Sequence, residues 1–514
     1  MAWLCAEGVL PQDSTIVFFT LLALISGVIV VTAVESAHLL GSWRWVVVSP
    51  LAVATLVWAT TFILRPTELY ISPRDTIGPL LQLGFSLSDL TRATAIVALG
   101  CATWSLGYLG GLMLASNRKP PHLPSLSFPV SLMSSAFAIG LGVCLAGALF
   151  IRQGGPNALI NNPGSLHLNK GSAFYGQFGI WVLVGTALYA LGGALQGGGK
   201  AAQRVLIVSA PLALLSTLAL ASRGLAVLGL LGALVIYLRF RTPARRTVAI
   251  MAALAVVLAI GLEFAAVVRT YAQETDAWTA TVRAVHTPPA AQQVADLSVF
   301  DDLLAMQKLI PDSIDWLGGR SLAEIPAALV PRGLWSGKPQ SLDNQVASYL
   351  YPGATAGTPI AMQGEFFWNF GLIGVAIGCC VLGALLGASM YLLFAGRSLA
   401  LLFYAVIFAS TFPLITRALG TMTANTVIAL AGVAIAYFAQ RGTLLGPALL
   451  ARRALRRPSS LGMRLSEFGR TVVNSKYSGH CRPIKVHGRL QKGSLGYRSA
   501  RATRGGLLIR SHSP

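Results

Sequence analysis

Charged residues are scarce in this chain of 514 residues. Asp, Glu, Lys and Arg together make up 11% of the sequence, whereas hydrophobic residues make up 54%. A soluble globular protein carries charge on about a quarter of its residues. The composition therefore excludes an ordinary soluble domain and predicts an all-α polytopic membrane protein.

Metal-binding motifs are also missing. The seven histidines and six cysteines form no His-x-x-x-His or Cys-x-x-Cys pair, which are the spacings that zinc sites use. Cys101, Cys144, Cys379 and Cys380 fall inside apolar stretches, where a free cysteine acts as a small buried hydrophobic residue. We therefore expect no disulfide framework, no metal site and no cofactor.

The N-terminus lacks the basic residues of a cleavable signal peptide. The first 13 residues contain Glu7 and Asp13 but no Lys or Arg. We therefore expect the first apolar stretch to be retained as a membrane span.

Apolar stretches of membrane length fill most of the chain before residue 441. A hydrocarbon core of about 30 Å needs roughly 20 apolar residues per helix. About eleven windows approach this length, at approximately 14–34, 45–64, 93–115, 127–151, 172–194, 204–221, 224–240, 247–267, 366–394, 398–416 and 420–439. The windows around Ser222-Arg223-Gly224 fit either two short helices or one helix kinked at Gly224.

The short loops between these windows predict the orientation. With this count of spans, nine basic residues of the short loops fall on the side of the C-terminal tail, and Arg223 falls on the other side. The nine are Arg118, Lys119, Lys200, Arg204, Arg239, Arg241, Arg245, Arg246 and Arg397. The positive-inside rule then predicts a cytoplasmic C-terminus, an N-terminus outside and a location in the cell's inner (plasma) membrane.

The tail from residue 441 to 514 carries most of the net charge of +21. It contains 16 Lys or Arg and one acid, Glu467, which gives about +15 for the tail. A basic tail after membrane spans indicates topology first and contact with anionic membrane lipid second, and it argues against nucleic acid as a partner. Its Gly, Ser and Arg content predicts disorder.

One long polar interval interrupts the spans. We divide the chain into transmembrane helices (1–266), a large, mostly helical exterior loop (267–365), further transmembrane helices (366–440) and the tail (441–514). The interval from Arg269 to Gly371 holds 10 of the 18 acidic residues together with several aromatic residues. Aromatic faces among charged groups suit a sugar-binding cap, although a small domain that only packs on the membrane helices would have the same composition.

Four arginines mark the exterior ends of predicted spans or the loop itself: Arg223, Arg269, Arg332 and Arg417. The guanidinium fork matches phosphate oxygens, so together they could bind a lipid pyrophosphate, while each alone could equally anchor a helix end or pair with an acid. Glu365 and Asn369 lie four residues apart, so they share a helix face with Trp368 beside them. A carboxylate there could act as a general base or position an arginine.

Three segments resemble the O-antigen or oligosaccharide repeat-unit polymerases (Wzy-like), polytopic glycosyltransferases that share a superfamily with the O-antigen ligases. The segments are Pro331-Arg332-x-Leu334-Trp335-x-x-Lys338-Pro339, then Gly364-Glu365-x-x-x-Asn369-Phe370-Gly371-x-x-Gly374, and more weakly Ser222-Arg223-Gly224. The resemblance covers approximately residues 200 to 430. The tail is longer and more basic than the family pattern.

The resemblance implies a reaction. A glycan on an undecaprenyl-pyrophosphate carrier is transferred, on the exterior face, onto another lipid-linked repeat unit, and a chain-length regulator protein is a possible partner. No nucleotide sugar is used, which agrees with the absence of an Asp-x-Asp motif.

In the reaction that the resemblance implies, the candidate residues have two roles. The candidate catalytic residues are Arg223, Arg269, Arg332 and Glu365, and the candidate substrate-binding residues are Lys338, Trp335, Trp368, Asn369, Arg417 and Asp301.

Three other functions remain open on the sequence. A ligase would move finished glycan to an outer acceptor, a flippase would transport lipid-linked sugars, and a scaffold would only bind them. A transporter is expected to place charges and broken helices at the bilayer midplane in repeated halves, whereas this chain has no internal repeat.

Overall fold

All regular secondary structure in the described part of the chain is helical, and this part contains no strand. The structure, a computed structural model, describes residues 7, 13–73, 80, 83–117, 125–152, 155, 173–219, 223–242, 279, 282, 299–330, 334–335, 337–351 and 357–442. All of them belong to one compact unit, Met1–Pro447. The predicted disordered tail lies outside the described residues from residue 443 onward.

Seven of the described helices are long and apolar enough to cross a membrane. They are α2 (Thr15–Leu40), α7 (Leu87–Ser116), α8 (Leu132–Arg152), α10 (Ala173–Leu195), α19 (Ala361–Phe394), α20 (Ser398–Thr416) and α21 (Leu419–Gln440). A membrane-embedded, all-helical protein is therefore confirmed. The larger count of about eleven spans stays a prediction.

The remaining predicted windows have three different outcomes in the structure. The window at 45–64 is divided among three consecutive pieces, namely α3 (Trp43–Val47), α4 (Pro50–Val57) and the π-helix η1 (Trp58–Leu64), and α5 (Arg65–Ile71) follows directly. The region around Arg223 forms two helices, α11 (Gly199–Ala219) and α12 (Arg223–Phe240), rather than one kinked helix. The window at 247–267 lies outside the described residues.

Helices α7 and α19 pack closely because both carry glycines at the contact. A side chain at Gly383 or Gly387 of α19 would collide with the backbone of Trp104 or Tyr108 on α7. In the same way, Gly107 of α7 faces the α19 backbone. The small residues at Gly383 and Gly387 thus let the two helix backbones approach closely.

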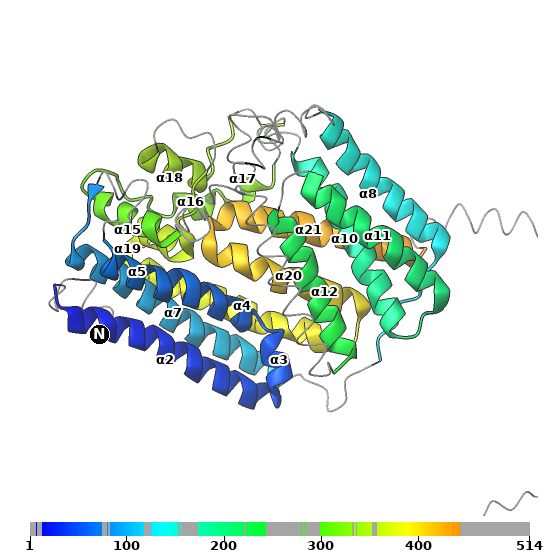
Figure 1. Cartoon of the computed structure of the whole chain (residues 1–514), viewed down its shortest axis with the longest axis horizontal. Helices are drawn as coiled ribbons and strands as arrows, with labels where there is room; N and C mark the ends of the chain where they lie inside the picture. The colour runs from blue at the N-terminus through cyan, green and yellow to red at the C-terminus, as the bar shows by residue number, and fades with distance from the viewer. Residues whose placement is uncertain are drawn as a thin grey trace, which may run out of the picture. The chain divides into compact units, whose positions relative to one another are not determined.

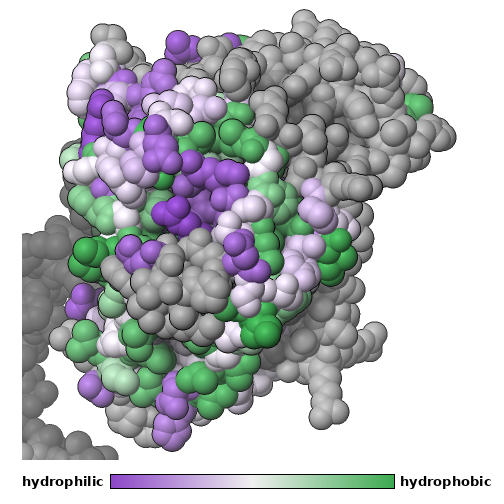
Figure 2. All heavy atoms as spheres, turned by 90° about the vertical axis from the view of Figure 1, so that its left-hand side faces the viewer, coloured by the Kyte–Doolittle hydropathy of each residue, from purple (hydrophilic) through white to green (hydrophobic). Residues whose placement is uncertain are grey.

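Four short helices cover one end of the membrane helices, which we call the cap end. They are α15 (Val299–Leu309), α16 (Arg320–Ala323), α17 (Ile325–Ala328) and α18 (Leu342–Leu350). Helices α15, α16 and α18 lie near the ends of α5 and α19 (Figure 1), and α17 packs against α21. Lys308 of α15 pairs with Asp89 of α7 at 2.8 Å. Figure 2 looks onto the cap end, where hydrophilic residues gather between hydrophobic ones.

The opposite end, which we call the basic end, collects predicted cytoplasmic loops. Arg44 Nη2 donates to the carbonyl oxygen of Arg241 at 2.9 Å, and Arg441 Nη2 donates to that of Ser127 at 3.4 Å. The Ser398 hydroxyl donates to the same Ser127 carbonyl. Ser398 and Arg441 thus meet at Ser127, and Arg44 meets Arg241 in a separate contact. The sharing of one side by the predicted basic loops and the compartment that this side faces stay predictions.

Candidate functional site

The cap end is organised by a kink in α19. Phe370 and Gly371 leave helical geometry, and Gly371 has φ 62° and ψ −150°, a combination essentially restricted to glycine. The kink frees the carbonyl of Trp368, which accepts a hydrogen bond from the Leu317 N–H at 3.0 Å. Trp368 Nε1 in turn donates to the Asp315 carbonyl at 2.9 Å. Two hydrogen bonds therefore fix residues 315–317 of the cap onto α19.

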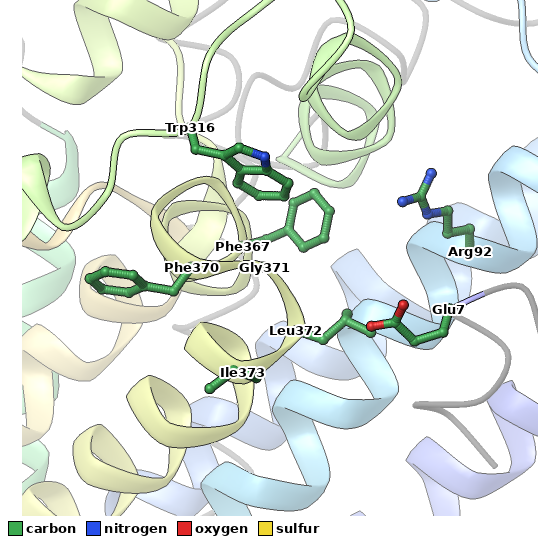
Figure 3. Close-up of a pocket in the computed structure, with 8 residues that line it drawn as sticks. All are labelled: Glu7, Arg92, Trp316, Phe367, Phe370, Gly371, Leu372 and Ile373. Carbon is green, nitrogen blue, oxygen red and sulfur yellow. The ribbon is translucent and has the colours of Figure 1, made fainter.

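This docking presents Trp316 to an open cavity of about 250 Å³. The cavity is lined by Glu7, Arg92, Trp316, Phe367, Phe370, Gly371, Leu372 and Ile373. Figure 3 shows Trp316 and Phe367 on one side and Arg92 on the other, while Phe370 points away. The Trp316 and Phe367 rings meet edge to face with centroids 5.5 Å apart. The cavity is slightly smaller than a typical small-molecule pocket, which starts near 300 Å³, so it suits one headgroup rather than a long glycan.

Arg92 gives this cavity a cation. It lies in the second turn of α7, is half-buried, and has no hydrogen-bond or ion-pair partner among the described residues. Trp316 keeps 43% of its surface exposed, so its ring face is available. An aromatic face beside a guanidinium fork is chemistry that suits a sugar ring carrying a phosphate.

On the other flank of α19, Glu365 is buried and fully hydrogen-bonded. Its Oε1 accepts from the Ser321 hydroxyl at 2.7 Å, and its Oε2 accepts from the Leu419 N–H at 2.6 Å. Asn369 Nδ2 donates to the same Ser321 oxygen at 2.8 Å, which confirms that Glu365 and Asn369 share a helix face. Glu365 thereby joins α16 of the cap to the first residue of α21.

A second buried carboxylate supports the same turn. Asp343 of α18 accepts from the Ala418 N–H at 3.2 Å, and Arg417 interacts with it electrostatically. Burial raises the pKa of Asp343, while Arg417 and the Ala418 N–H act in the opposite direction. Asp343 and Glu365 therefore hold the turn 417–419 between α20 and α21 from two sides.

Of the four predicted arginines, the structure describes the side chain of Arg417 alone. Arg417 lies at the cap end, on the turn just described. Arg223 is the first residue of α12, where only the backbone is described, and Arg269 and Arg332 lie outside the described residues. Whether these arginines converge stays a prediction.

The other predicted binding residues serve internal contacts or stand apart. Asp301 is buried and forms a two-pronged ion pair with Arg65, at 2.9 and 2.6 Å. Trp368 is buried beneath residues 315–317, and Lys338 Nζ donates to the carbonyls of Ala328 and Val330. Trp335 stays 42% exposed and does not line the cavity. Of the predicted substrate-binding residues, none lines the cavity.

Sequence reasoning missed four residues of this region: Arg92, Trp316, Ser321 and Asp343. Arg92 could have been found by the criterion applied to the other arginines, because it stands at the predicted exterior start of a span. In the sequence, Trp316 and Asp343 are only two of the many aromatic and charged residues of the loop at 267–365. Nothing in the sequence signals that Ser321 meets Glu365.

Comparison with known proteins adds no assignment, since no protein-family model, curated protein or solved structure matches the chain.

Proposed function

We propose that this protein is a membrane glycosyltransferase that polymerises lipid-linked oligosaccharide repeat units on the exterior face of the membrane. The cap end is the exterior side in this proposal. The donor and acceptor are glycans on a polyprenyl-pyrophosphate carrier, and the product is a surface polysaccharide.

One observation carries the proposal, namely the position of the cavity relative to the apolar surface of α19. Directly beyond the cavity, large apolar side chains follow at four-residue spacing and face outward. They are Ile373, Ile377, Val381 and Leu385, exposed by 60%, 61%, 53% and 65%. Residues at this spacing share one helix face, which in a membrane lies against lipid. A lipid-linked sugar could thus place its tail along α19 and its headgroup in the cavity.

One charge of the cavity, the Arg92 guanidinium, fits the proposed transfer, whereas Glu7 lines the same cavity with a carboxylate. An acceptor hydroxyl attacks the anomeric carbon of the donor sugar and gives up its proton to water, the bond to the carrier pyrophosphate breaks, and negative charge develops on the leaving pyrophosphate. Arg92 is placed to bind a phosphate of this group, and Arg223, Arg269 and Arg332 are proposed to assist it. Trp316 would stack on a sugar ring.

Glu365 takes a positioning role in this scheme. Both of its carboxylate oxygens are engaged within the protein, so it holds the 417–419 turn rather than meeting substrate. Arg417 would then be oriented by this turn.

The positions of the α19 kink and of one buried ion pair favour an enzyme over a flippase. The α19 kink at residues 370–371 and the Arg65–Asp301 pair both lie at the cap end rather than midway along the helices. A transporter is expected to place such features at the bilayer midplane.

The proposal is tested by deleting the gene and complementing it with variants. Deletion should leave single repeat units, and wild-type protein should restore long glycan, measured by gel analysis of surface polysaccharide. Arg92→Ala should shorten the glycan strongly, because removing one charge-assisted hydrogen bond to phosphate from the transition state slows the reaction about 10-fold or more. Arg152→Ala is the matched control, since Arg152 is an exposed arginine at the end of α8. Wild-type glycan length in the deletion strain would refute the proposed function.

A further inference from the structure

Helix α19 folds back on itself at its kink. Phe366 precedes the kink, yet a Cβ at Gly378 would collide with the Phe366 ring, and a Cβ at Gly374 would collide with the Phe366 carbonyl. In a straight helix, Phe366 and Gly378 would be about 18 Å apart along the axis. Residues 361–369 therefore form a half-helix that lies beside the second part of α19.

The half-helix begins inside the helix bundle. A Cβ at Gly100 of α7 would lie 2.6 Å from Gln363 Cγ and 3.4 Å from Cys379 Sγ, so both parts of α19 meet α7 at this level. Gly100 follows Asp89, which pairs with Lys308 at the cap end, by about three helical turns. The start of the half-helix is therefore buried among helices that are long and apolar enough to cross a membrane.

Gln363 carries a buried amide without a protein partner. The residue is fully buried, and neither its Nε2 nor its Oε1 forms a hydrogen bond with a described residue. Gln363 is the third residue of the half-helix, and the N-cap residue, Ile360, has an apolar side chain that cannot cap it. The first N–H groups of a helix have no partner within the helix. Donors and an acceptor thus meet in an apolar interior, where unpaired polar groups are costly.

Two more donors lie one turn deeper along α7. Trp104 follows Gly100 by four residues, and its indole meets that of Trp58 edge to face with ring centroids 5.0 Å apart. Both tryptophans are fully buried, and neither Nε1 has a hydrogen-bond partner in the described part of the chain. The unpartnered groups are all uncharged, which favours a neutral ligand that can both accept and donate hydrogen bonds.

We propose that the start of the half-helix binds a small cluster of water molecules inside the bundle. The waters accept from the first-turn N–H groups and from Gln363 Nε2, and they donate to Gln363 Oε1. The indole N–H groups of Trp104 and Trp58 supply further donors one turn deeper.

The water site lies beneath the cavity of the cap end. Phe367 lines that cavity and follows Gln363 by four residues, so the two residues share a face of the half-helix. The waters therefore carry polar surface from below the cavity into the bundle. The proposal does not rest on the proposed glycan transfer.

X-ray radiolysis of the purified full-length protein, followed by mass spectrometry, tests the site. Radiolysis of bound water releases hydroxyl radicals that oxidise the side chains beside it, so a buried methionine is labelled only where water is held. Met362, the second residue of the half-helix, should be oxidised much faster than Met390, which is equally buried in the second part of α19. Equally slow oxidation of Met362 and Met390 would overturn the proposal.

Variants locate the effect. Gln363→Leu should abolish the excess oxidation of Met362, because an apolar side chain of similar size cannot hold the water. Thr103→Val is the matched control on α7. The Thr103 hydroxyl already donates to the Leu99 carbonyl at 2.9 Å, so this change should leave the oxidation of Met362 as it is.

Thermal unfolding gives a second readout. If no water were bound, Gln363→Leu would remove a buried amide that has no partner and would raise the melting temperature. A raised melting temperature, or unchanged oxidation of Met362 in folded Gln363→Leu protein, would therefore contradict the site. The wild-type comparison of Met362 with Met390 needs no variant, so it tests the site even if Gln363→Leu fails to fold.

Discussion

At the scale of single residues, the question is whether Glu365 acts as a general base or as a positioning residue. Its two oxygens bind the Ser321 hydroxyl and the Leu419 N–H, so it links three parts of the chain from a fully buried position. A general base needs a free oxygen near the proton that it removes. The geometry therefore favours positioning over proton transfer, and the two roles can be separated by substitution.

Glu365→Gln should keep the fold and much of the polymerising activity, because the amide oxygen can still accept from Leu419 and the Ser321 hydroxyl can rotate. Glu365→Ala should lower the free energy of unfolding by about 2–3 kcal/mol, since it leaves buried donors without acceptors. Thermal unfolding and glycan length measure the two effects. A normally folded Glu365→Gln protein without any activity would instead indicate a base.

The sequence could predict part of this arrangement. The spacing of four residues was enough to place Glu365 and Asn369 on one face, and the structure joins both to Ser321. The partners on other elements, Ser321 and Leu419, are brought together only by tertiary packing. Helical periodicity carries no information about such contacts.

At the scale of elements, the length of a helix was easier to predict from the sequence than the breaks within it. Hydropathy identified the long spans, because it measures whether enough apolar residues follow one another. The same measure gave one span at 45–64, where the structure has a break before Pro50 and a π-helix from Trp58. Composition over a window does not register these backbone changes, although Pro at the first helical position is a start signal.

The α19 kink should depend on Gly371. Gly371→Ala should lower the free energy of unfolding by about 1–3 kcal/mol, because the added Cβ meets only ordinary contact with Trp316 but the backbone conformation is strained. Gly110→Ala on α7 is the matched control. Its Cβ would have no neighbour within 4 Å, so this change should be neutral or slightly stabilising. Equal thermal stability of both variants would show that the kink relaxes without glycine.

At the scale of the whole molecule, the two ends of the helices differ in chemistry. The cap end holds the buried carboxylates Glu365, Asp343 and Asp301 together with the buried Arg65, while the basic end holds the buried Arg239. The positive-inside rule assigns the basic end to the cytoplasm.

This orientation predicts the behaviour of reporter fusions. Green fluorescent protein fused after Gln440, the last residue of α21, should fluoresce, and alkaline phosphatase fused there should be inactive. A phosphatase inserted after Gly357, in the segment before α19, should be active, because that segment belongs to the cap end. The reverse pattern would place the cap in the cytoplasm and exclude an exterior transferase.

The central claim is tested most directly by the reaction of the purified protein. Lipid-linked single repeat units, extracted from the deletion strain, are incubated with it and the products are resolved by mass spectrometry. Folded Arg92→Ala protein should give little product. For the wild type, the proposed polymerisation predicts carriers bearing multiples of the repeat unit, with one free polyprenyl pyrophosphate released per transfer. Unchanged single units after incubation with folded wild-type protein would contradict it.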